Sequence, residues 1–585
     1  MSKKSLRAVT LTVVATLVAA LLPAGFVFAG DADITLTSVM RQTEPVTLYL
    51  ASSSQVSTFD PQRATDAVSL SQIENMFLGL TNYSSTEAGK IEAELATSWE
   101  FNEDGTTWTF TIRDDVPWVH WDPAAQEAEV LRNVTAYDIE YGIKRGCDPR
   151  LGSLYGEVLA TIIDGCDLIN HKNIDEVTDA DYDQVNVSAL DDTTLEINLQ
   201  FSAGYFFSMS ALWTMYPVPR EVIEEYGDDW TELGNIVTNG PFVLDQYVRG
   251  VRRVLIRNPY MPADLIGPGN VERVITTVVE DQGTRYALYL DNQIESTGIP
   301  QAELQAVLTD ESYSNQLRQI SDLGVFYFGF AHDKAPFDDV HARRAFSAIV
   351  SREAYIAEVE TNRGVPMIHF TPPGMFGAVP INEVGVGFDP DFARAEFALA
   401  GYEDCEGFPT IDINTFSSAG DWAEFLAAAA ERELGCDPNL IRVNAMEFSV
   451  LLESYKADVP TAQRPHMWTG VWGPDYPDAN NWVFDAGLAC ESENRYLRAC
   501  SEVDDLIAQA AREPDPEIRT ELYYRIEELF FGPEGEQPII PLMLRVDQVL
   551  YKPWYTGPFE TDGLFGGPHY DWRTVDAEAQ QAERG

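Results

Sequence analysis

Strand-like and helix-like segments alternate along the whole chain, and this alternation limits the possible fold more than any other feature. "VTLYLA" (46–51) and "TTLEINLQ" (193–200) show the alternating apolar pattern of strands, whereas "DWAEFLAAAAERELG" (421–435) has the spacing of a helix. No segment recurs at a fixed period, and 585 residues exceed what one core supports. The pattern predicts a mixed α/β protein with several sheets in two or three domains.

Two segments allow sharper local predictions. In "WEFNEDGTTWTFTIRDDVPW" (99–118), "EDG" separates two strand-like runs, which is typical of a β-hairpin. "DVHARRAFSAIVSREAYIAEV" (339–359) is predicted to form one long helix, because its apolar residues keep a helical spacing throughout.

The charge of the chain excludes several classes of partner. There are 93 acidic and 39 basic residues, which gives a net charge of −54. Nucleic acid and anionic membrane surfaces both require a basic face, so neither is an expected partner. The apolar fraction of 45% excludes a disordered chain. We expect a folded protein with an acidic, solvated surface.

The first 29 residues have the three parts of a secretory signal peptide. A basic start is followed by an apolar stretch and by small residues, with Val27 and Ala29 before a cut at Gly30. The apolar stretch is too short for a stable membrane span. No cysteine follows the cut, so no lipoprotein anchor is expected. The mature protein is predicted to be periplasmic or extracellular.

Six cysteines suit such an oxidising compartment. They form three pairs of sequence neighbours, and we expect each pair to be a disulfide, although buried free thiols are an alternative. A zinc site is disfavoured because no CxxC or HxxxH spacing occurs. The expected pairs are Cys147 with Cys166, Cys405 with Cys436, and Cys490 with Cys500.

Motifs of catalysis are missing from the sequence. It contains no GxSxG, Walker A, HExxH or strand-linked GxGxxG motif, and its seven histidines are scattered. We therefore expect a binding protein with no catalytic residues, no cofactor and no metal. A secreted hydrolase is the alternative from another class.

Several ordered blocks between about residues 46 and 573 carry a resemblance to a known family. They are "LATSWEFNEDGTTWTFTIRDDVPW" (95–118), "NVTAYDIEYGIKR" (133–145), "NIVTNGPF" (235–242), "KAPFDDVHARRAFSAIVSREAYI" (334–356), "FTPPG" (370–374) and "VLYKPWYTG" (549–557). In these blocks the chain resembles the bacterial extracellular solute-binding proteins of family 5, the peptide-binding subunits of ATP-binding-cassette importers. "NIVTNGPF" and "FTPPG" look most similar to the oligopeptide-binding branch.

The resemblance implies a two-lobed α/β clamshell of the class II periplasmic-binding-protein type. Residues 574–585 are left as a polar tail, and chain crossings near 320 and 541 are the expected hinge. A monomer is expected, which delivers a peptide ligand to permease subunits with their ATPases and has no membrane span of its own. The implied parts are lobe one (46–86, 205–320 and 541–573), a subdomain inserted into it (87–204) and lobe two (321–540).

The resemblance also assigns a role to "GVWGPDYPDANNW" (470–482). In the family a W-x-x-D motif supplies the carboxylate that holds the α-ammonium of the peptide; here it comprises Trp472, Gly473, Pro474 and Asp475. A solvated turn is the alternative, and calcium is disfavoured because the D-x-D-x-D-G spacing is absent. Asp478 is expected to serve only the bend, so that replacing it changes little.

Two other parts of the ligand site are implied less directly. Thr65, Asp66 and Ala67 align with the segment that pairs edge-on with the ligand backbone; an ordinary loop is the alternative. Thr469 stands where the oligopeptide branch can have an arginine for the ligand carboxylate, so ligand length and sequence preference stay open. Relatives of the same fold bind oligosaccharides, opines or metal complexes, and these remain alternative ligands.

Overall fold

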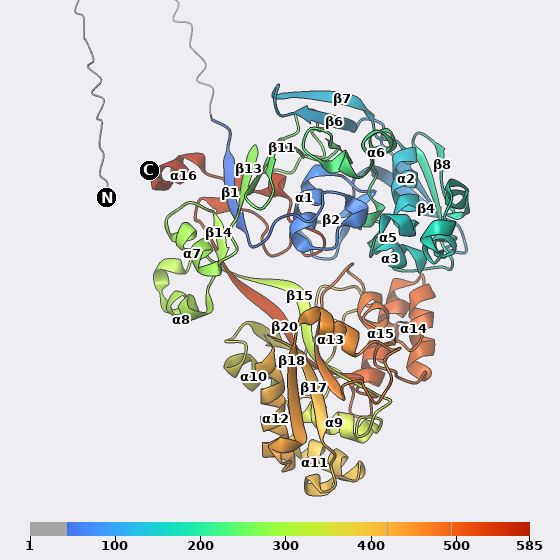
Figure 1. Cartoon of the computed structure of the whole chain (residues 1–585), viewed down its shortest axis with the longest axis vertical. Helices are drawn as coiled ribbons and strands as arrows, with labels where there is room; N and C mark the ends of the chain where they lie inside the picture. The colour runs from blue at the N-terminus through green and yellow to red at the C-terminus, as the bar shows by residue number, and fades with distance from the viewer. Residues whose placement is uncertain (1–43, 418, 493, 585) are drawn as a thin grey trace, which may run out of the picture. The chain divides into compact units, whose positions relative to one another are not determined.

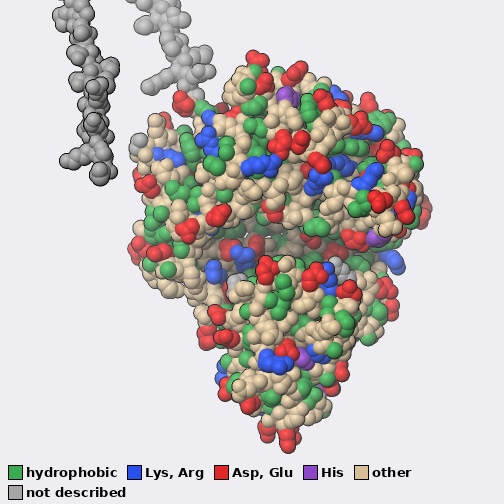
Figure 2. Space-filling model, in the orientation of Figure 1, with side chains coloured by type: hydrophobic (Ala, Val, Ile, Leu, Met, Phe, Trp, Pro, Cys, Tyr) green, Lys and Arg blue, Asp and Glu red, His purple; other side chains and the backbone are tan. Residues whose placement is uncertain are grey.

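The computed structural model describes residues 44–584 except 418 and 493. The expected signal peptide (1–29) and its cut at Gly30 lie outside the described residues. Among the described helices, none is long and apolar enough to cross a membrane. Acidic side chains are spread over the visible face of the molecule and do not gather in one patch (Figure 2).

Buried apolar side chains divide the described chain into two lobes. The core of the first lobe comes from residues 48–274 and 554–575, and the core of the second from 323–544. A few residues cross over: Tyr476 is buried in the first core, whereas Tyr83, Ala211 and Phe565 pack with the second. The expected mixed α/β, two-lobed architecture is confirmed.

The first lobe is built on two four-stranded sheets. In the order β1-β13-β12-β11, β1 pairs parallel with β13 and the other neighbours are antiparallel. The second sheet, β4-β5-β9-β8, contains the predicted hairpin, whose turn has Gly105 at φ +68°. The strands are β1 (Thr47–Ser52), β2 (Thr81–Tyr83), β3 (Ile91–Ala93), β4 (Ala96–Phe101), β5 (Thr107–Ile112), β6 (Pro117–Asp122), β7 (Glu127–Asn133), β8 (Val187–Asp191), β9 (Thr194–Asn198), β10 (Val237–Thr238), β11 (Phe242–Val248), β12 (Arg252–Arg257) and β13 (Arg273–Val278).

Two helices of the first lobe begin at well-formed polar caps. Asp66 caps α1, and Thr135 with Asp138 forms a capping box at α2, which stabilises the otherwise unpaired N–H groups of the first turn. The helices that precede β15 are α1 (Ala67–Met76), α2 (Ala136–Cys147), α3 (Gly156–Ala160), α4 (Cys166–Asn170), α5 (Phe206–Met209), α6 (Arg220–Tyr226), α7 (Gln282–Leu290) and α8 (Gln301–Thr309).

A seven-stranded sheet carries the second lobe. Its order is β14-β20-β15-β19-β17-β18, with β16 paired to β20. The strands are β14 (Ser296–Gly298), β15 (Leu317–Phe330), β16 (Gly364–Pro366), β17 (Ile411–Phe416), β18 (Ile441–Met446), β19 (Met467–Trp472) and β20 (Ile539–Tyr551). The helices are α9 (Val340–Ala348), α10 (Arg352–Glu358), α11 (Pro390–Leu399), α12 (Gly420–Leu434), α13 (Phe448–Ser454), α14 (Glu502–Arg512) and α15 (Pro516–Phe531).

The prediction of one long helix over 339–359 was wrong. The segment forms α9 and α10, and between them Ser351 accepts a hydrogen bond from the N–H of Ala354. Ser351 therefore caps a second helix within an unbroken apolar pattern. Apolar spacing cannot distinguish such a break from a continuous helix.

Two long strands connect the lobes. β15 and β20 pair antiparallel from Leu317 opposite Leu550 to Gly329 opposite Ile539, and Figure 1 shows them running between the lobes. The pairing is interrupted where residues 322–324 of β15 oppose the single residue Arg545. Leu323 in this bulge has φ +59°, a left-handed conformation uncommon outside glycine. The ladder between the lobes is thus interrupted here, and its register shifts again between Phe326 and Tyr327.

The three disulfides have the pairing expected from neighbouring cysteines. Cys147 is bonded to Cys166, Cys405 to Cys436, and Cys490 to Cys500.

Residues expected as a polar tail form β22 (Thr574–Val575) and α16 (Ala577–Arg584). β22 pairs with β21 (Tyr555–Thr556). Arg584 forms an ion pair with the buried Glu295 at 3.0 Å and lies over the ring of Tyr49, so the last helix packs on the first lobe.

Candidate functional site between the lobes

The W-x-x-D segment begins where β19 ends. Trp472 is the last residue of the strand and is paired with Val325 of β15, so the bend that follows leaves the centre of the sheet beside the bulge. The Trp472 indole N–H donates to Asn481 Oδ1 at 3.3 Å. Gly473 is exposed, and a Cβ built on it would meet no atom within 4 Å. The backbone at Gly473 is therefore open to an approaching group.

Asp475 lies in this bend, partly buried, with both carboxylate oxygens bonded to neutral groups. Tyr155 Oη donates to Oδ1 at 2.8 Å, and Asn481 Nδ2 donates to Oδ2 at 3.1 Å. Burial raises the pKa of Asp475, and the hydrogen bonds from Asn481 and Tyr155 partly offset this rise. The negative charge is thus held in place by neutral donors, and no Lys, Arg or His of the described residues forms an ion pair with it.

A second carboxylate adjoins the first. Asn481 Nδ2 also reaches Asp485 Oδ2 at 3.0 Å, and Tyr476 Oη donates to the same oxygen at 2.6 Å. Burial raises the pKa of Asp485 to about 6. One amide therefore bridges Asp475 and Asp485, an arrangement that the sequence analysis missed.

Tyr155, also missed, comes from the first lobe just before α3. Its ring packs edge-on against Trp213 with centroids 4.8 Å apart, and the Trp213 indole N–H donates to Ala64 O at 3.0 Å. Tyr155 therefore connects Asp475 to the segment 64–67 through one intervening side chain. No local motif identifies Tyr155, which lies 320 residues from its partner.

The segment Thr65, Asp66 and Ala67 combines one hydrogen-bonded side chain, that of Asp66, with two exposed residues. The Asp66 carboxylate accepts from the N–H groups of Val68 and Ser69 at 3.1 and 2.9 Å, so it is occupied as a helix cap. Thr65 and Ala67 are exposed, and among the described residues the backbone of Thr65 forms no hydrogen bond. The Thr65 backbone is free for an edge-on partner, whereas the Asp66 side chain is not.

The expectation for Asp478 was wrong. Asp478 is 1% exposed and forms an ion pair with Arg519 of α15 at 2.7 Å, with Tyr523 Oη at 3.2 Å. It also accepts from the N–H of Asn480, as a bend residue does. Its main partner is thus a buried guanidinium 41 residues away, which local turn chemistry does not reveal.

The donor groups give little support to a metal site. Within the described part of the chain, one group of three ligand-type residues is close enough to hold an ion: Cys490, Cys500 and Asp504. Both cysteines are bonded to each other, so neither supplies a thiolate. Asp478 is occupied by Arg519, which also weakens the calcium alternative.

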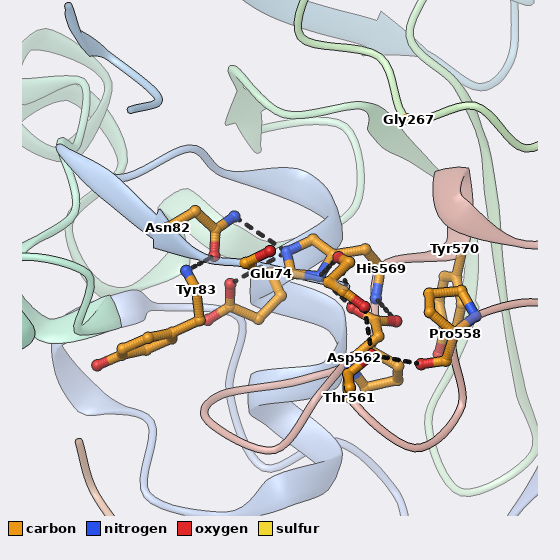
Figure 3. Close-up of polar contacts among 12 residues, drawn as sticks. Glu74, Asn82, Tyr83, Gly267, Pro558, Thr561, Asp562, His569 and Tyr570 are labelled. Atoms are coloured by element: carbon orange, nitrogen blue, oxygen red, sulfur yellow. Dashed lines mark hydrogen bonds and ion pairs between the residues drawn. The ribbon is translucent and has the colours of Figure 1, made fainter. Parts of the chain in front are cut away.

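Another buried polar cluster lies within the first lobe (Figure 3). His569 Nδ1 lies 2.7 Å from Asp562, and Asn82 Nδ2 lies 3.0 Å from His569 Nε2 and 2.9 Å from Glu94. Tyr216 Oη donates to Glu74 at 2.7 Å. Burial raises the pKa of Glu74 to about 7 and that of Glu94 to about 8. The cluster joins α1, the β2–β3 hairpin and the segment 562–569.

Two lobes joined by paired strands, with a partly buried carboxylate where side chains of both lobes meet, define a two-lobed binding protein. The chain belongs to the bacterial extracellular solute-binding proteins of family 5, whose middle-region model matches residues 90–488. Members of this family are binding proteins rather than enzymes.

Individual relatives extend the comparison. The periplasmic oligopeptide-binding protein OppA of Salmonella typhimurium is 28% identical, covering 96% of this chain and 98% of that protein. The probable deoxycholate-binding periplasmic protein YgiS of Escherichia coli is 27% identical, covering 86% and 88%. The unliganded open form of the murein tripeptide binding protein MppA is similar with a TM-score of 0.73 at 24% identity, covering 91% and 98%. The last similarity supports the fold alone.

Proposed function

We propose that this chain is the extracytoplasmic peptide-binding subunit of an ATP-binding-cassette importer. It captures an oligopeptide or dipeptide between its lobes and delivers it to permease subunits with their ATPases. It acts as a monomer without catalysis, exported by a signal peptide cut before Gly30. The observation that carries the proposal is the partly buried carboxylate of Asp475, whose partners Tyr155 and Asn481 are both neutral.

The chemistry of Asp475 fits a free amino terminus. A carboxylate has about four acceptor positions, and Tyr155 and Asn481 use one on each oxygen. An ammonium group brings three donors and a full positive charge, so it fills the remaining positions and balances the charge of Asp475. A hydroxyl-rich sugar supplies donors but no charge, and an anionic ligand is repelled.

The exposed backbone at Thr65 supports the second contact. We infer that the ligand backbone pairs edge-on with Thr65, Asp66 and Ala67, a mode whose affinity depends little on ligand sequence. The link from Ala64 through Trp213 and Tyr155 to Asp475 supports a backbone contact close to the amine socket, the proposed ammonium site at Asp475.

The proposed division of the chain keeps the sequence boundaries. Lobe one comprises 46–86, 205–320 and 541–573 with 87–204 inserted, and lobe two comprises 321–540. The bulge in β15 at 322–324 supports a hinge beside residue 320, because the strand ladder is interrupted there.

Calorimetry with three probes tests the function. Tri-alanine is expected to bind, whereas N-acetyl-tri-alanine, which lacks the ammonium, and deoxycholate, which is an anion, are expected to bind weakly or not at all. Tight binding of deoxycholate with no binding of tri-alanine would assign the chain to an anionic steroid ligand and reject the proposal.

A further inference from the structure

A second contact between the lobes lies apart from the connecting strands β15 and β20. The N–H of Gly204, in the first lobe, donates to the carbonyl oxygen of Ala511 at 2.9 Å. Ala511 is in the last turn of α14, where carbonyl groups have no partner inside the helix. Gly204 therefore satisfies a helix end of the opposite lobe, and Figure 1 shows α5 and α3 facing α14 and α15 there.

Glycine is required at this contact for space. A Cβ on residue 204 would lie 2.8 Å from the backbone oxygen of Glu513 and 3.1 Å from Arg519 Nε. The oxygen belongs to the backbone, so it cannot move aside as the end of a side chain does. The two lobes approach each other as closely here as a glycine allows.

Aromatic side chains on both sides of Gly204 extend the contact. The guanidinium of Arg512 lies over the Phe201 ring at 5.5 Å, and that of Arg519 lies 5.9 Å from the Tyr205 ring. Such cation–π contacts add attraction between the lobes. The Tyr205 ring also stacks on Tyr476, with centroids 5.8 Å apart and planes 12° apart.

This stack leads directly to the amine socket. Tyr476 follows Asp475 in the bend, and its hydroxyl donates to Asp485. Asn481 Nδ2 then joins Asp485 to Asp475. Moving Tyr205 away from Tyr476 therefore disturbs the group that orients the Asp475 amide partner.

We propose that residues 201–205 form a latch that docks on the ends of α14 and α15 when the lobes close, and that its Tyr205–Tyr476 stack positions Asp475. The latch sets how long a bound peptide is retained. Gly204 and Tyr205 are positioning residues that act through the bend and do not touch the ligand amine. The part of this proposal that concerns peptide release rests on the proposed function.

The first experiment compares two glycine substitutions. Gly204→Ala introduces the clash with Glu513, whereas Gly387→Ala is a matched control, because a Cβ at residue 387 meets no atom within 4 Å. Stopped-flow release of tri-alanine is expected to be roughly tenfold or more faster for Gly204→Ala and unchanged for Gly387→Ala. The association rate and the binding stoichiometry should stay constant, which separates a lost latch from misfolding. Equal release rates for all three proteins would overturn the latch.

The second experiment isolates the stack. Tyr205→Phe keeps the ring on Tyr476, and Tyr205→Ala removes it. We expect wild-type release from Tyr205→Phe and release roughly tenfold faster from Tyr205→Ala. Fast release from both variants, or from neither, would reject the positioning role.

A ligand-free measurement keeps the latch testable if tri-alanine does not bind. Hydrogen exchange followed by mass spectrometry reports the amides of residues 201–205 in wild type, Gly204→Ala and Gly387→Ala. Exchange faster only in Gly204→Ala supports the latch even where the peptide function fails. Equal exchange in the three proteins, with residue 204 unprotected, overturns it.

Discussion

At the scale of single residues, two aspartates three positions apart have opposite roles. Asp475 is partly buried against neutral Tyr155 and Asn481, and among residues 44–584 as described no cationic side chain pairs with it. Asp478 is fully buried, and its charge is matched by Arg519. The first is available to a positively charged ligand, and the second holds the bend against α15.

Asp475→Asn tests the first role. The substitution keeps the shape and removes the charge, so tri-alanine should bind about 10- to 100-fold more weakly, between the effects of exposed and buried pairs. N-acetyl-tri-alanine should lose about as much on wild type and nothing further on Asp475→Asn, because both changes remove the same pair. Calorimetry measures all four combinations, with Asp505→Asn, an exposed acid on α14, as the control. Additive losses would show that Asp475 does not contact the amine.

Asp478→Asn tests the second role. Removing one partner of a buried ion pair leaves the Arg519 guanidinium uncompensated, and the expected loss of unfolding free energy is about 3–5 kcal/mol. Urea denaturation measures it, with Asp505→Asn again as the reference. A midpoint equal to that of wild type would mean that the pair contributes nothing net.

Sequence analysis proposed residues that carry a motif of the resembled family and missed those defined by a distant partner. Trp472 and Asp475 stand in the W-x-x-D motif, so both could be proposed as ligand contacts. Tyr155 and Arg519 act through side chains that meet only in the folded chain, 320 and 41 residues from their partners. Asp478 was misassigned for that reason: its turn chemistry is real but is the smaller part of its environment.

At the scale of elements, local patterns located most strands and helices but not every boundary. The hairpin of β4 and β5 and the separation of α14 from α15 by prolines follow from turn and breaker residues. The break between α9 and α10 depends on one serine cap inside an apolar pattern, and spacing alone conceals it. The order of strands in the seven-stranded sheet depends on long-range pairing that periodicity does not encode.

The cluster of Glu74, Glu94 and His569 predicts how stability depends on pH. Both glutamates have folded pKa values, about 7 and about 8, above the ordinary 4.5. At a pH between the ordinary value of 4.5 and these raised values, the folded state binds protons that the unfolded state has released. The free energy of unfolding therefore falls as the pH rises from about 5 to 8. Burial opposes the charge of His569, but Asp562 outweighs it and raises the pKa of His569 to about 10, so its contribution is lost on further alkalinisation.

Chemical denaturation between pH 5 and pH 9 measures this dependence. Glu74→Gln should flatten the curve, since its amide does not titrate, whereas Glu103→Gln, in an exposed turn, should leave the slope unchanged. A flat wild-type curve, or equal slopes for the two variants, would show that the cluster does not govern stability at alkaline pH.

At the scale of the whole molecule, the lobes meet at the β15–β20 crossing, at the Tyr155–Asp475 hydrogen bond and at the Gly204 contact, and Figure 2 shows a hollow between them. A ligand that contacts both lobes favours the closed arrangement by the difference of its affinities for the two states. Small-angle scattering should therefore give a smaller radius of gyration at saturating tri-alanine than without it. An unchanged profile, with binding shown by calorimetry, would exclude closure as the response to ligand.

The placement of the disulfides bears on this motion. Cys147–Cys166 lies within the first lobe, and the other two lie within the second, so none of the three disulfides of the described residues joins one lobe to the other. The disulfides therefore stiffen each lobe separately and do not themselves restrain the opening between the lobes. Reducing the disulfides would destabilise the individual lobes without changing how far the lobes can open relative to each other.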